Sequence, residues 1–491
     1  MRLAAGLAIF VSGCTLISEA PRHDVVIKNG MIYDGSGSAP YAGYVTIDKD
    51  RITAVAKGKA PRGRTVIDAG GKAIAPGFVN MLSHSEESLL VDGRAQSDLR
   101  QGVTPEDREG DIKYKIDWTT LGEYLQKLEK KGISPNVASF VGEGTVRVNV
   151  LGEKDVQPTP EQLKQMRELV RQAMEEGALG LTTALIYAPN SFAKTPELID
   201  LMTEAARCGG IYTAHIRSEG DRLKEGIQEL IDVAKATGAP AELYHFKQAG
   251  KSNWNKLDEA VGMIEKARAE GTRITANMYN YTAGATGLDA AMPTWVQSGG
   301  LEAWIANLKK PKIRARVIRE MRDPHPNWEN LARAAGPDGM LFLAFKNEKL
   351  KPLTGKTLTE VAKMRGTDPE DTMIDLVIED GSRVGVAYFL MSEDNVKRQT
   401  ALPFISFGSD EAGEMPEGVF LKSASHPRAY GNFARLLGKY VREEKALTLQ
   451  DAVRKLSALP SDNLSLDHRG HLAPGYFADV VVFDPATIAD H

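Results

Sequence analysis

The spacing of hydrophobic residues changes once along the chain, near residue 73. Up to that point, short apolar runs alternate with polar residues and are separated by segments rich in Gly, Ser, Pro and Asn. The runs lie at 24–30, 44–47, 51–55 and 65–68. Alternation with a period of two is typical of half-buried strands, and the Asn29-Gly30 pair in the first run indicates a hairpin turn. Residues 24–72 are therefore predicted to form a small antiparallel β unit.

From residue 73 onward, short apolar segments alternate with helical stretches. The predicted strands lie at 73–79, 137–141, 179–183, 210–214, 241–244, 273–276 and 403–407. Between them, residues 161–176 carry apolar side chains at a spacing near 3.6 residues, as an amphipathic helix requires, and residues 196–208 and 221–237 behave similarly. Strands that alternate with helices predict a parallel sheet. With an eighth strand expected near Gly102, the fold class predicted is α/β, a (β/α)₈ barrel.

Two further segments complete the predicted domain organisation. Residues 285–400 break the alternation and are interpreted as an insertion between the seventh and eighth strands. Strands one to seven then occupy 73–284, and strand eight with the final helices occupies 401–464. The apolar run near the end of 465–491 predicts a strand that returns to the N-terminal β unit, because chain termini often lie close together. The two terminal segments are predicted to form a small β-sandwich.

Composition limits the class of protein. The 491 residues are 42% hydrophobic and 26% charged, which is typical of a globular chain. The formal net charge is −4 and there is no basic stripe, so nucleic-acid binding is not expected. Beyond the N-terminus, no segment approaches the ~20 unbroken apolar residues of a membrane-spanning helix.

The N-terminus predicts a location. It contains one Arg, a short apolar run and the sequence Val11-Ser12-Gly13-Cys14, which has the form of a secretory signal and resembles a bacterial lipobox. Residues 1–20 are therefore predicted to be a signal or lipoprotein segment, and the protein to be periplasmic or anchored to a membrane through lipid on Cys14. An uncleaved anchor and a wrongly assigned start are the alternatives.

Three ionisable residues follow predicted barrel strands: His215, His245 and Asp410. The carboxyl ends of barrel strands meet at one mouth, where catalytic groups collect. Two imidazoles and a carboxylate suit zinc, which would polarise an amide carbonyl and activate a water molecule. A carboxylate beside that water can move its proton to the leaving nitrogen. Each histidine alone could be a hydrogen-bonded structural residue, but three such residues on three strands favour a metal site.

Several motifs resemble those of the amidohydrolase superfamily. Residues 75–80, Ala-Pro-Gly-Phe-Val-Asn, resemble its first barrel strand, and residues 469–484 resemble its closing β-sandwich segment. Motifs similar to the N-acyl-D-amino-acid deacylase (D-aminoacylase) branch lie at 215–219 (His-Ile-Arg-Ser-Glu), 279–284 (Tyr-Asn-Tyr-Thr-Ala-Gly), 408–410 (Gly-Ser-Asp) and 426–431 (His-Pro-Arg-Ala-Tyr-Gly). The resemblance covers residues 24–491. It implies a zinc enzyme that deacylates small N-acyl-D-amino acids.

The resemblance also implies roles for individual residues. His215 and His245 match the histidine ligands of zinc, and Asp410 matches the catalytic carboxylate and could be a third ligand. Arg217 matches the arginine that holds the substrate carboxylate, a task for which a bidentate guanidinium is suited. Three more residues follow predicted strands and could line the substrate pocket or serve only in packing: Lys247, Tyr187 and Tyr281.

Two departures from the family pattern reduce the expected number of metal ligands. The family has Asp-x-His-x-His after strand one, whereas this chain has Asn80, Leu82 and His84. His84 could still bind zinc or could be a solvated loop residue. After Gly102, a proline and five charged residues occupy 105–111, where a central barrel strand cannot form. We therefore expect one zinc ion rather than two.

Three functions remain open from the sequence. The leading one is metal-dependent hydrolysis of an amide C–N bond in an N-acyl-D-amino acid. The second is another amidohydrolase reaction, on a dipeptide or a cyclic amide, which fold analogy cannot separate from the first. The third is a catalytically impaired remnant, suggested by the altered segments 80–84 and 102–111. Metal content distinguishes the third function from the other two.

Overall fold

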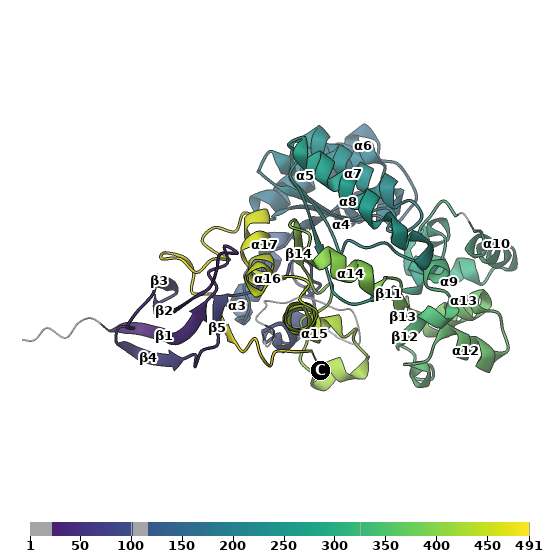
Figure 1. The fold of residues 1–491 in the computed structure, drawn as a ribbon. Coiled ribbons are helices and arrows are strands. Elements are labelled where there is room, and N and C mark those ends of the chain that lie inside the picture. The colour runs from purple at the N-terminus through teal and green to yellow at the C-terminus, as the bar shows by residue number, and fades with distance from the viewer. Residues whose placement is uncertain (1–21, 100, 102–115, 325, 491) are drawn as a thin grey trace, which may run out of the picture.

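A computed structural model of the chain describes residues 22–99, 101, 116–324 and 326–490. Figure 1 shows a small β domain, a central barrel flanked by helices, and a helical lobe on the far side of the barrel. The expected signal or lipoprotein segment 1–20 and the expected second barrel strand near Gly102 lie outside the described residues. Among the helices that are described, none is long and apolar enough to cross a membrane.

The small β domain joins the two ends of the described chain in one sheet. Its strands are β1 (His23–Ile32), β2 (Tyr41–Asp48), β3 (Arg51–Ala56), β4 (Gly63–Asp68), β5 (Ala73–Pro76) and β15 (Val480–Phe483). The order is β15-β5-β1-β2-β3, with β4 also paired to β1. Val480 lies opposite Pro76 and Phe483 opposite Ala73, so the tail returns to the N-terminal unit as the sequence predicts.

The prediction of a turn at Asn29-Gly30 is wrong, because β1 continues through this pair as a bulge. The register against β2 shifts between Ile27 and Gly30, and Asn29 adopts a left-handed φ of 56°. An extra residue in one strand changes which side chains share a face. Ile27 and Ile32 consequently pack in the same hydrophobic cluster, although an unbroken strand would place them on opposite faces.

The barrel contains a six-stranded parallel sheet in sequence order. Its strands are β6 (Val141–Gly142), β7 (Gly180–Ala184), β8 (Ile211–His215), β9 (Ala241–Leu243), β10 (Ile274–Met278) and β14 (Ile405–Phe407). The segment after β5 runs beside β14: the Met81 N–H donates to the Phe407 carbonyl, and the Asp410 N–H donates to the Leu82 carbonyl. Strand one thus contributes to both the β domain and the barrel.

The predicted strand at 137–141 is much shorter than expected. Only Val141 and Gly142 form a ladder, opposite Leu181 and Thr182 of β7. A strand needs hydrogen-bonding partners, and among the described residues this sheet ends at β6.

Amphipathic helices surround the barrel. They are α4 (Glu143–Leu151), α5 (Pro160–Glu175), α6 (Thr195–Ala206), α7 (Leu223–Thr237) and α8 (Leu257–Ala269). The start of α5 shows why they form at these positions: Thr159 and Gln162 make a capping box, and Pro160 occupies the first turn. Its buried face, with Met166 and Val170, joins the barrel core.

The segment between β10 and β14 forms a separate lobe. Its antiparallel sheet has the order β11-β13-β12, from β11 (Ala283–Gly287), β12 (Met340–Ala344) and β13 (Gly385–Phe389). Its helices are α9 (Gly300–Leu308), α10 (Pro311–Met321), α11 (Leu331–Ala335), α12 (Leu358–Arg365) and α13 (Pro369–Asp380). The last helix of the segment, α14 (Glu393–Thr400), packs against the barrel instead, where Gln399 donates to the Phe246 carbonyl. The other α-helices are α1 (Ser88–Val91), α2 (Gln96–Leu99), α3 (Leu121–Lys131), α15 (Arg428–Arg435), α16 (Leu449–Leu456) and α17 (Ala458–Asn463).

Candidate active site

A cavity of about 1840 Å³ lies at the mouth of the barrel, between the strand ends and the lobe that carries β11 to β13. The charged and ionisable residues that line it near the strand ends include His84, His215, Glu219, His245, Lys247, Asp410 and Arg428. These residues follow different strands, and the parallel sheet brings them to one mouth.

Two of the lining residues lie where the backbone turns sharply after a strand. His245 has a φ of 37° just beyond β9, and Asp410 has a φ of 53° just beyond β14. The left-handed region is disfavoured for residues with a side chain, and such strain is concentrated at functional sites. His215 needs no such turn, because it is the last residue of β8.

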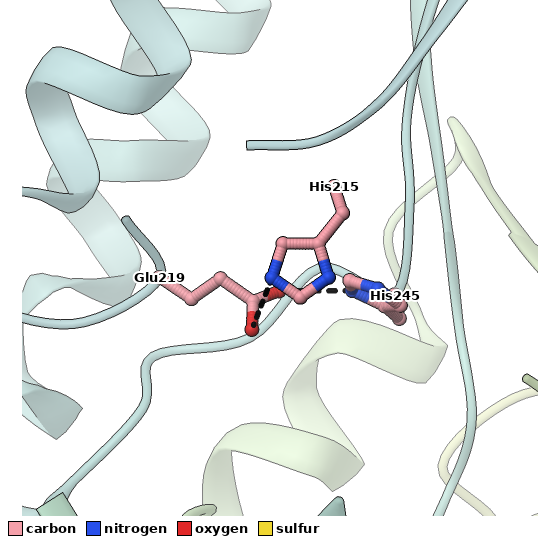
Figure 2. A group of neighbouring side chains, drawn as sticks. All are labelled: His215, Glu219 and His245. Carbon is pink, nitrogen blue, oxygen red and sulfur yellow. Dashed lines mark ion pairs between the residues drawn. The ribbon is translucent and has the colours of Figure 1, made fainter. Parts of the chain in front are cut away.

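His215, Glu219 and His245 form a compact buried cluster, shown in Figure 2. Each offers one ligand atom, and these atoms all lie within 4.8 Å of one another. Glu219 Oε1 is 2.8 Å from His245 Nδ1, and Glu219 Oε2 is 3.6 Å from His215 Nε2. Ligands bonded at ~2 Å to one ion have separations of about this size.

The chemistry of this cluster fits a divalent cation such as zinc. The His215 Nε2 atom is buried and has no hydrogen-bond partner among the described residues, so its lone pair is available to an ion. Burial lowers the pKa of His215 to about 3, which keeps the imidazole neutral. Burial alone would raise the pKa of Glu219, but neighbouring groups, with the charge of Lys247 foremost, hold that pKa well below its usual range. Neutral imidazoles and an ionised carboxylate are the forms that bind metal.

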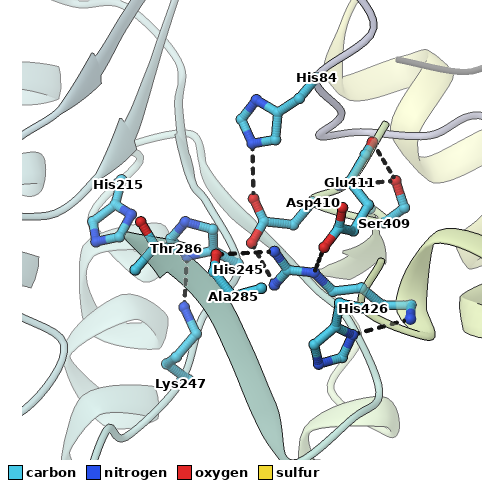
Figure 3. Close-up of polar contacts among 12 residues, drawn as sticks. His84, His215, His245, Lys247, Ala285, Thr286, Ser409, Asp410, Glu411 and His426 are labelled. Carbon is cyan, nitrogen blue, oxygen red and sulfur yellow. Dashed lines mark hydrogen bonds and ion pairs between the residues drawn. The ribbon is translucent and has the colours of Figure 1, made fainter. Parts of the chain in front are cut away.

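Asp410 has different partners in the same cavity (Figure 3). Its Oδ2 is 2.7 Å from Arg428 Nη1, and its Oδ1 is 3.1 Å from His84 Nε2. Burial opposes ionisation, yet the charge of Arg428 and the hydrogen bond from His84 hold the pKa of Asp410 well below its usual range. Asp410 is therefore an ionised carboxylate in the same cavity as the compact cluster.

The structure brings His215 and His245, two members of the predicted ligand set, into the compact cluster, and it leaves the third, Asp410, outside. Within the described residues, the compact cluster contains Glu219 in place of Asp410, and it does not include His84. The positive Arg428 side chain pairs with the Asp410 carboxylate, and His84 bonds to that carboxylate. Asp410 and His84 both line the cavity, but they are hydrogen-bonded to each other there.

The structure does not place Arg217, the residue predicted to hold the substrate carboxylate, in the lining of the cavity. Its guanidinium donates to both carboxylate oxygens of Glu229 on α7 and to the carbonyls of Ser191 and Ala193. These bonds tie the loop after β8 to helix α7, and a contact between Arg217 and the substrate carboxylate stays a prediction.

The three predicted pocket residues have different surroundings. Lys247 lines the cavity and donates to Glu219 Oε1 at 2.6 Å. Tyr187 also lines it, with its ring centroid 5.5 Å from that of His215. Tyr281 instead donates to Asp490 Oδ2 at 3.0 Å and lies against Arg435, away from the cavity. Its neighbour in the motif, Tyr279, is the tyrosine that lines the cavity.

Two residues of the site were not assigned a site role from the sequence. Glu219 is in the quoted His-Ile-Arg-Ser-Glu motif, but it follows the strand by four residues, where strand position gives no signal. Arg428 is in the quoted His-Pro-Arg-Ala-Tyr-Gly motif, but it lies far beyond the predicted strand at 403–407, so strand position gives no signal there either. His426 shapes the backbone of this motif, because its Nδ1 accepts the Arg428 N–H at 3.0 Å.

The altered segment after strand one has a structural role. The Asn80 amide donates to Ser409 Oγ and accepts the Ser409 N–H, both at 2.8 Å. Leu82 packs its backbone against Gly408, where a Cβ atom would lie 2.7 Å from the Leu82 nitrogen. The positions that carry Asp and His in the family pattern therefore hold strand one against β14 here.

A parallel barrel with two buried imidazoles and a carboxylate clustered at its mouth defines a class of protein, the metal-dependent hydrolases. Within that class, the chain belongs to the amidohydrolase family, whose sequence profile matches residues 65–490.

Comparison with known proteins narrows the relationship. N-acyl-D-glutamate deacylase of Alcaligenes xylosoxydans xylosoxydans is 29% identical, over 95% of this chain and 88% of that protein. A crystal structure of N-acyl-D-glutamate deacylase from Bordetella bronchiseptica, complexed with zinc and a phosphonate inhibitor, is similar with a TM-score of 0.79 and 26% identity, covering 96% of this chain and 92% of that one. A D-aminoacylase structure, from work describing one-metal activation and second-metal attenuation of its binuclear centre, has a TM-score of 0.78 and 26% identity, covering 95% and 91%.

Proposed function

We propose that this protein hydrolyses the amide bond of N-acyl-D-amino acids, with a zinc ion held by His215, Glu219 and His245. The observation that carries the proposal is the presence of this cluster and an ionised Asp410 in one cavity. Relatives named for deacylation of N-acyl-D-glutamate support the substrate class.

The side chains divide the work of hydrolysis between them. Zinc, when bound, would polarise the scissile carbonyl and make water more acidic. Asp410 takes a proton from the water that attacks the carbonyl carbon, and it delivers a proton to the nitrogen as the C–N bond breaks. The products are a carboxylic acid and the free amino acid. His84 and Arg428 hold the Asp410 carboxylate in place during these transfers.

The substrate carboxylate needs cationic partners, and several cations other than Arg217 line the cavity. Lys247 and Arg428 both line it, and both lie over the ring of Tyr279, at 5.4 Å and 4.4 Å from the centroid. We assign the substrate carboxylate to these two cations, with Tyr187 and Tyr279 as walls of the pocket. A guanidinium and an ammonium can together orient one carboxylate.

A single zinc ion agrees with the side chains present. Leu82 stands where the family pattern has a histidine, and His84 bonds to Asp410. The described residues therefore retain one compact set of ligands. The one-metal activation named for D-aminoacylase supports the same number.

Metal analysis and a stereochemical assay test the proposal together. Purified protein should contain about one zinc per chain, and His215→Ala or His245→Ala should abolish both zinc and activity. N-acetyl-D-amino acids should be hydrolysed in preference to their L enantiomers. Protein that stays metal-free after zinc reconstitution would support the alternative of a catalytically impaired remnant. Hydrolysis of only the L enantiomers would contradict the proposed specificity for N-acyl-D-amino acids.

We also propose that residues 1–20 direct the protein to the periplasm, with lipid on Cys14 as its membrane anchor. The form of Val11-Ser12-Gly13-Cys14 supports this proposal. Cell fractionation tests it: Cys14→Ser should move the protein out of the membrane fraction, and an unchanged distribution would contradict lipidation.

A further inference from the structure

A carboxyl group is buried inside the barrel, below the proposed zinc site. Glu242 belongs to β9 and precedes the ligand His245 by three residues. Its side chain is 1% exposed and accepts hydrogen bonds from the Thr275 hydroxyl and, at 3.1 Å, from the Asn277 amide. Burial raises the pKa of Glu242 to about 7. A buried carboxyl is costly, and this one does not line the cavity, so its presence requires an explanation in the barrel interior.

Asn277 connects this carboxyl to the backbone of the metal ligand. Its Nδ2 donates to Glu242 Oε1, and its Oδ1 accepts the His245 N–H at 2.9 Å. A side-chain amide has a donor end and an acceptor end. Because Glu242 accepts from the donor end, the acceptor end faces His245.

The hydrogen bond from the His245 N–H lies at a strained turn of the backbone. The ladder of β9 ends at Leu243, and His245 adopts its left-handed φ of 37° two residues later. The next N–H, of Phe246, donates to the Asn277 carbonyl at 2.8 Å. Two consecutive N–H groups of the turn therefore bind one residue of β10. This turn directs the imidazole toward His215 and Glu219.

We propose that Glu242 and Asn277 are positioning residues for the zinc ligand His245. Glu242 sets the orientation of the Asn277 amide, and that amide fixes the backbone turn that aims the imidazole. The inference rests on the proposed zinc site and concerns how the chain maintains it. Groups that orient a metal ligand contribute about 10- to 100-fold to metal affinity.

Zinc affinity, measured by competition with a chelator, tests this role. Glu242→Leu should weaken zinc binding by about 10- to 100-fold, because the donor end of the Asn277 amide then loses the acceptor that fixes it. Glu242→Gln should retain the affinity, since its carbonyl still accepts from Nδ2. Thr275→Val is the matched control, because Thr275 bonds to the other oxygen of Glu242 and should leave zinc binding unchanged. Absorption spectra of the cobalt-substituted proteins should show altered ligand geometry in Glu242→Leu alone.

A double variant separates orientation from packing. Asp has two equivalent oxygens, so Asn277→Asp presents an acceptor to His245 whichever way it turns. Glu242→Leu combined with Asn277→Asp should therefore recover zinc affinity to within about threefold of wild type, whereas a packing defect would persist. If Glu242→Leu does not fold, Asn277→Ala removes the same link from the other side and should weaken zinc binding comparably.

Several outcomes would overturn the inference. They are a Glu242→Leu affinity within twofold of wild type, a Thr275→Val loss as large as that of Glu242→Leu, and no recovery in the double variant. Wild-type protein that binds no zinc would overturn the proposed function and this inference together. Zinc binding that is equal in wild type and Glu242→Leu would overturn this inference alone.

Discussion

Individual side chains in the cavity have separate roles in the proposed function, in which one set binds metal and another moves protons. Glu219 lies with His215 and His245 in the compact cluster, whereas Asp410 is held by Arg428 and His84. Two ionised carboxylates in one cavity thus have separate partners. The partners of Glu219 are His215, His245 and Lys247, and none of them pairs with Asp410.

Asp410→Asn should lower kcat by about 10²- to 10⁴-fold and leave the zinc content unchanged, because the carboxylate moves protons and does not bind metal in this arrangement. Steady-state kinetics with metal analysis of the same preparations measures both effects. The matched variant Glu219→Gln should lose zinc. An Asp410→Asn protein that contains no zinc would show that Asp410 is a zinc ligand.

At the scale of elements, the contact between strand one and β14 places the catalytic carboxylate. Asn80 and Ser409 exchange two hydrogen bonds, and the Asp410 N–H donates to the Leu82 carbonyl. Gly408 permits the close approach, because a Cβ atom there would lie 2.7 Å from the Leu82 nitrogen. The position of Asp410 therefore depends on how closely these two segments pack.

Gly408→Ala should destabilise the protein by about 1–3 kcal/mol and lower kcat, because the added methyl group forces strand one away from β14. Chemical denaturation and steady-state kinetics measure the two effects. Gly262→Ala on α8 is the control, since a Cβ atom there meets nothing within 4 Å, and it should be neutral or mildly stabilising. A Gly408→Ala protein with the stability and kcat of wild type would show that the contact between strand one and β14 has room for the added methyl group.

Particular residues in these elements show which parts of the fold and the site can be predicted from sequence patterns. His215 could be identified because it ends an apolar strand, and barrel topology then places it at the mouth. Glu219 could not, because it is a loop residue whose position depends on tertiary packing. Arg217 was assigned through a family motif, but its bonds to Glu229 depend on where α7 lies. Asn29-Gly30 carries a turn signal that the register of β1 and β2 overrides as a bulge.

For the molecule as a whole, the buried neutral imidazole of His215 links stability to pH. Its pKa is lowered to about 3 in the folded protein, so between that pH and about 6.5 the unfolded chain binds the proton and the folded protein does not. This contribution to stability is present above about pH 6.5 and is lost as the pH falls toward 3.

Metal-free His215→Asn should therefore show a weaker loss of stability in acid than metal-free wild type. The difference in their free energies of unfolding should change by up to about 1.4 kcal/mol per pH unit between pH 6 and 4. Denaturant titrations at each pH measure it. Parallel pH profiles for the two proteins would show that His215 is accessible to protons in the folded state.

The pairing of β15 with β5 has a consequence for the order of assembly. β5 is bonded to β1 through only two residue pairs, at Met31 and Ile32, but to β15 along its whole length. The ribosome makes β15 more than 400 residues after β5. The segment that carries Asn80 and His84 to the cavity thus lacks the support of β15 until at least 480 residues have been made. A nascent chain can form most barrel strands early, but the mouth of the barrel is complete only after β15 has left the ribosome.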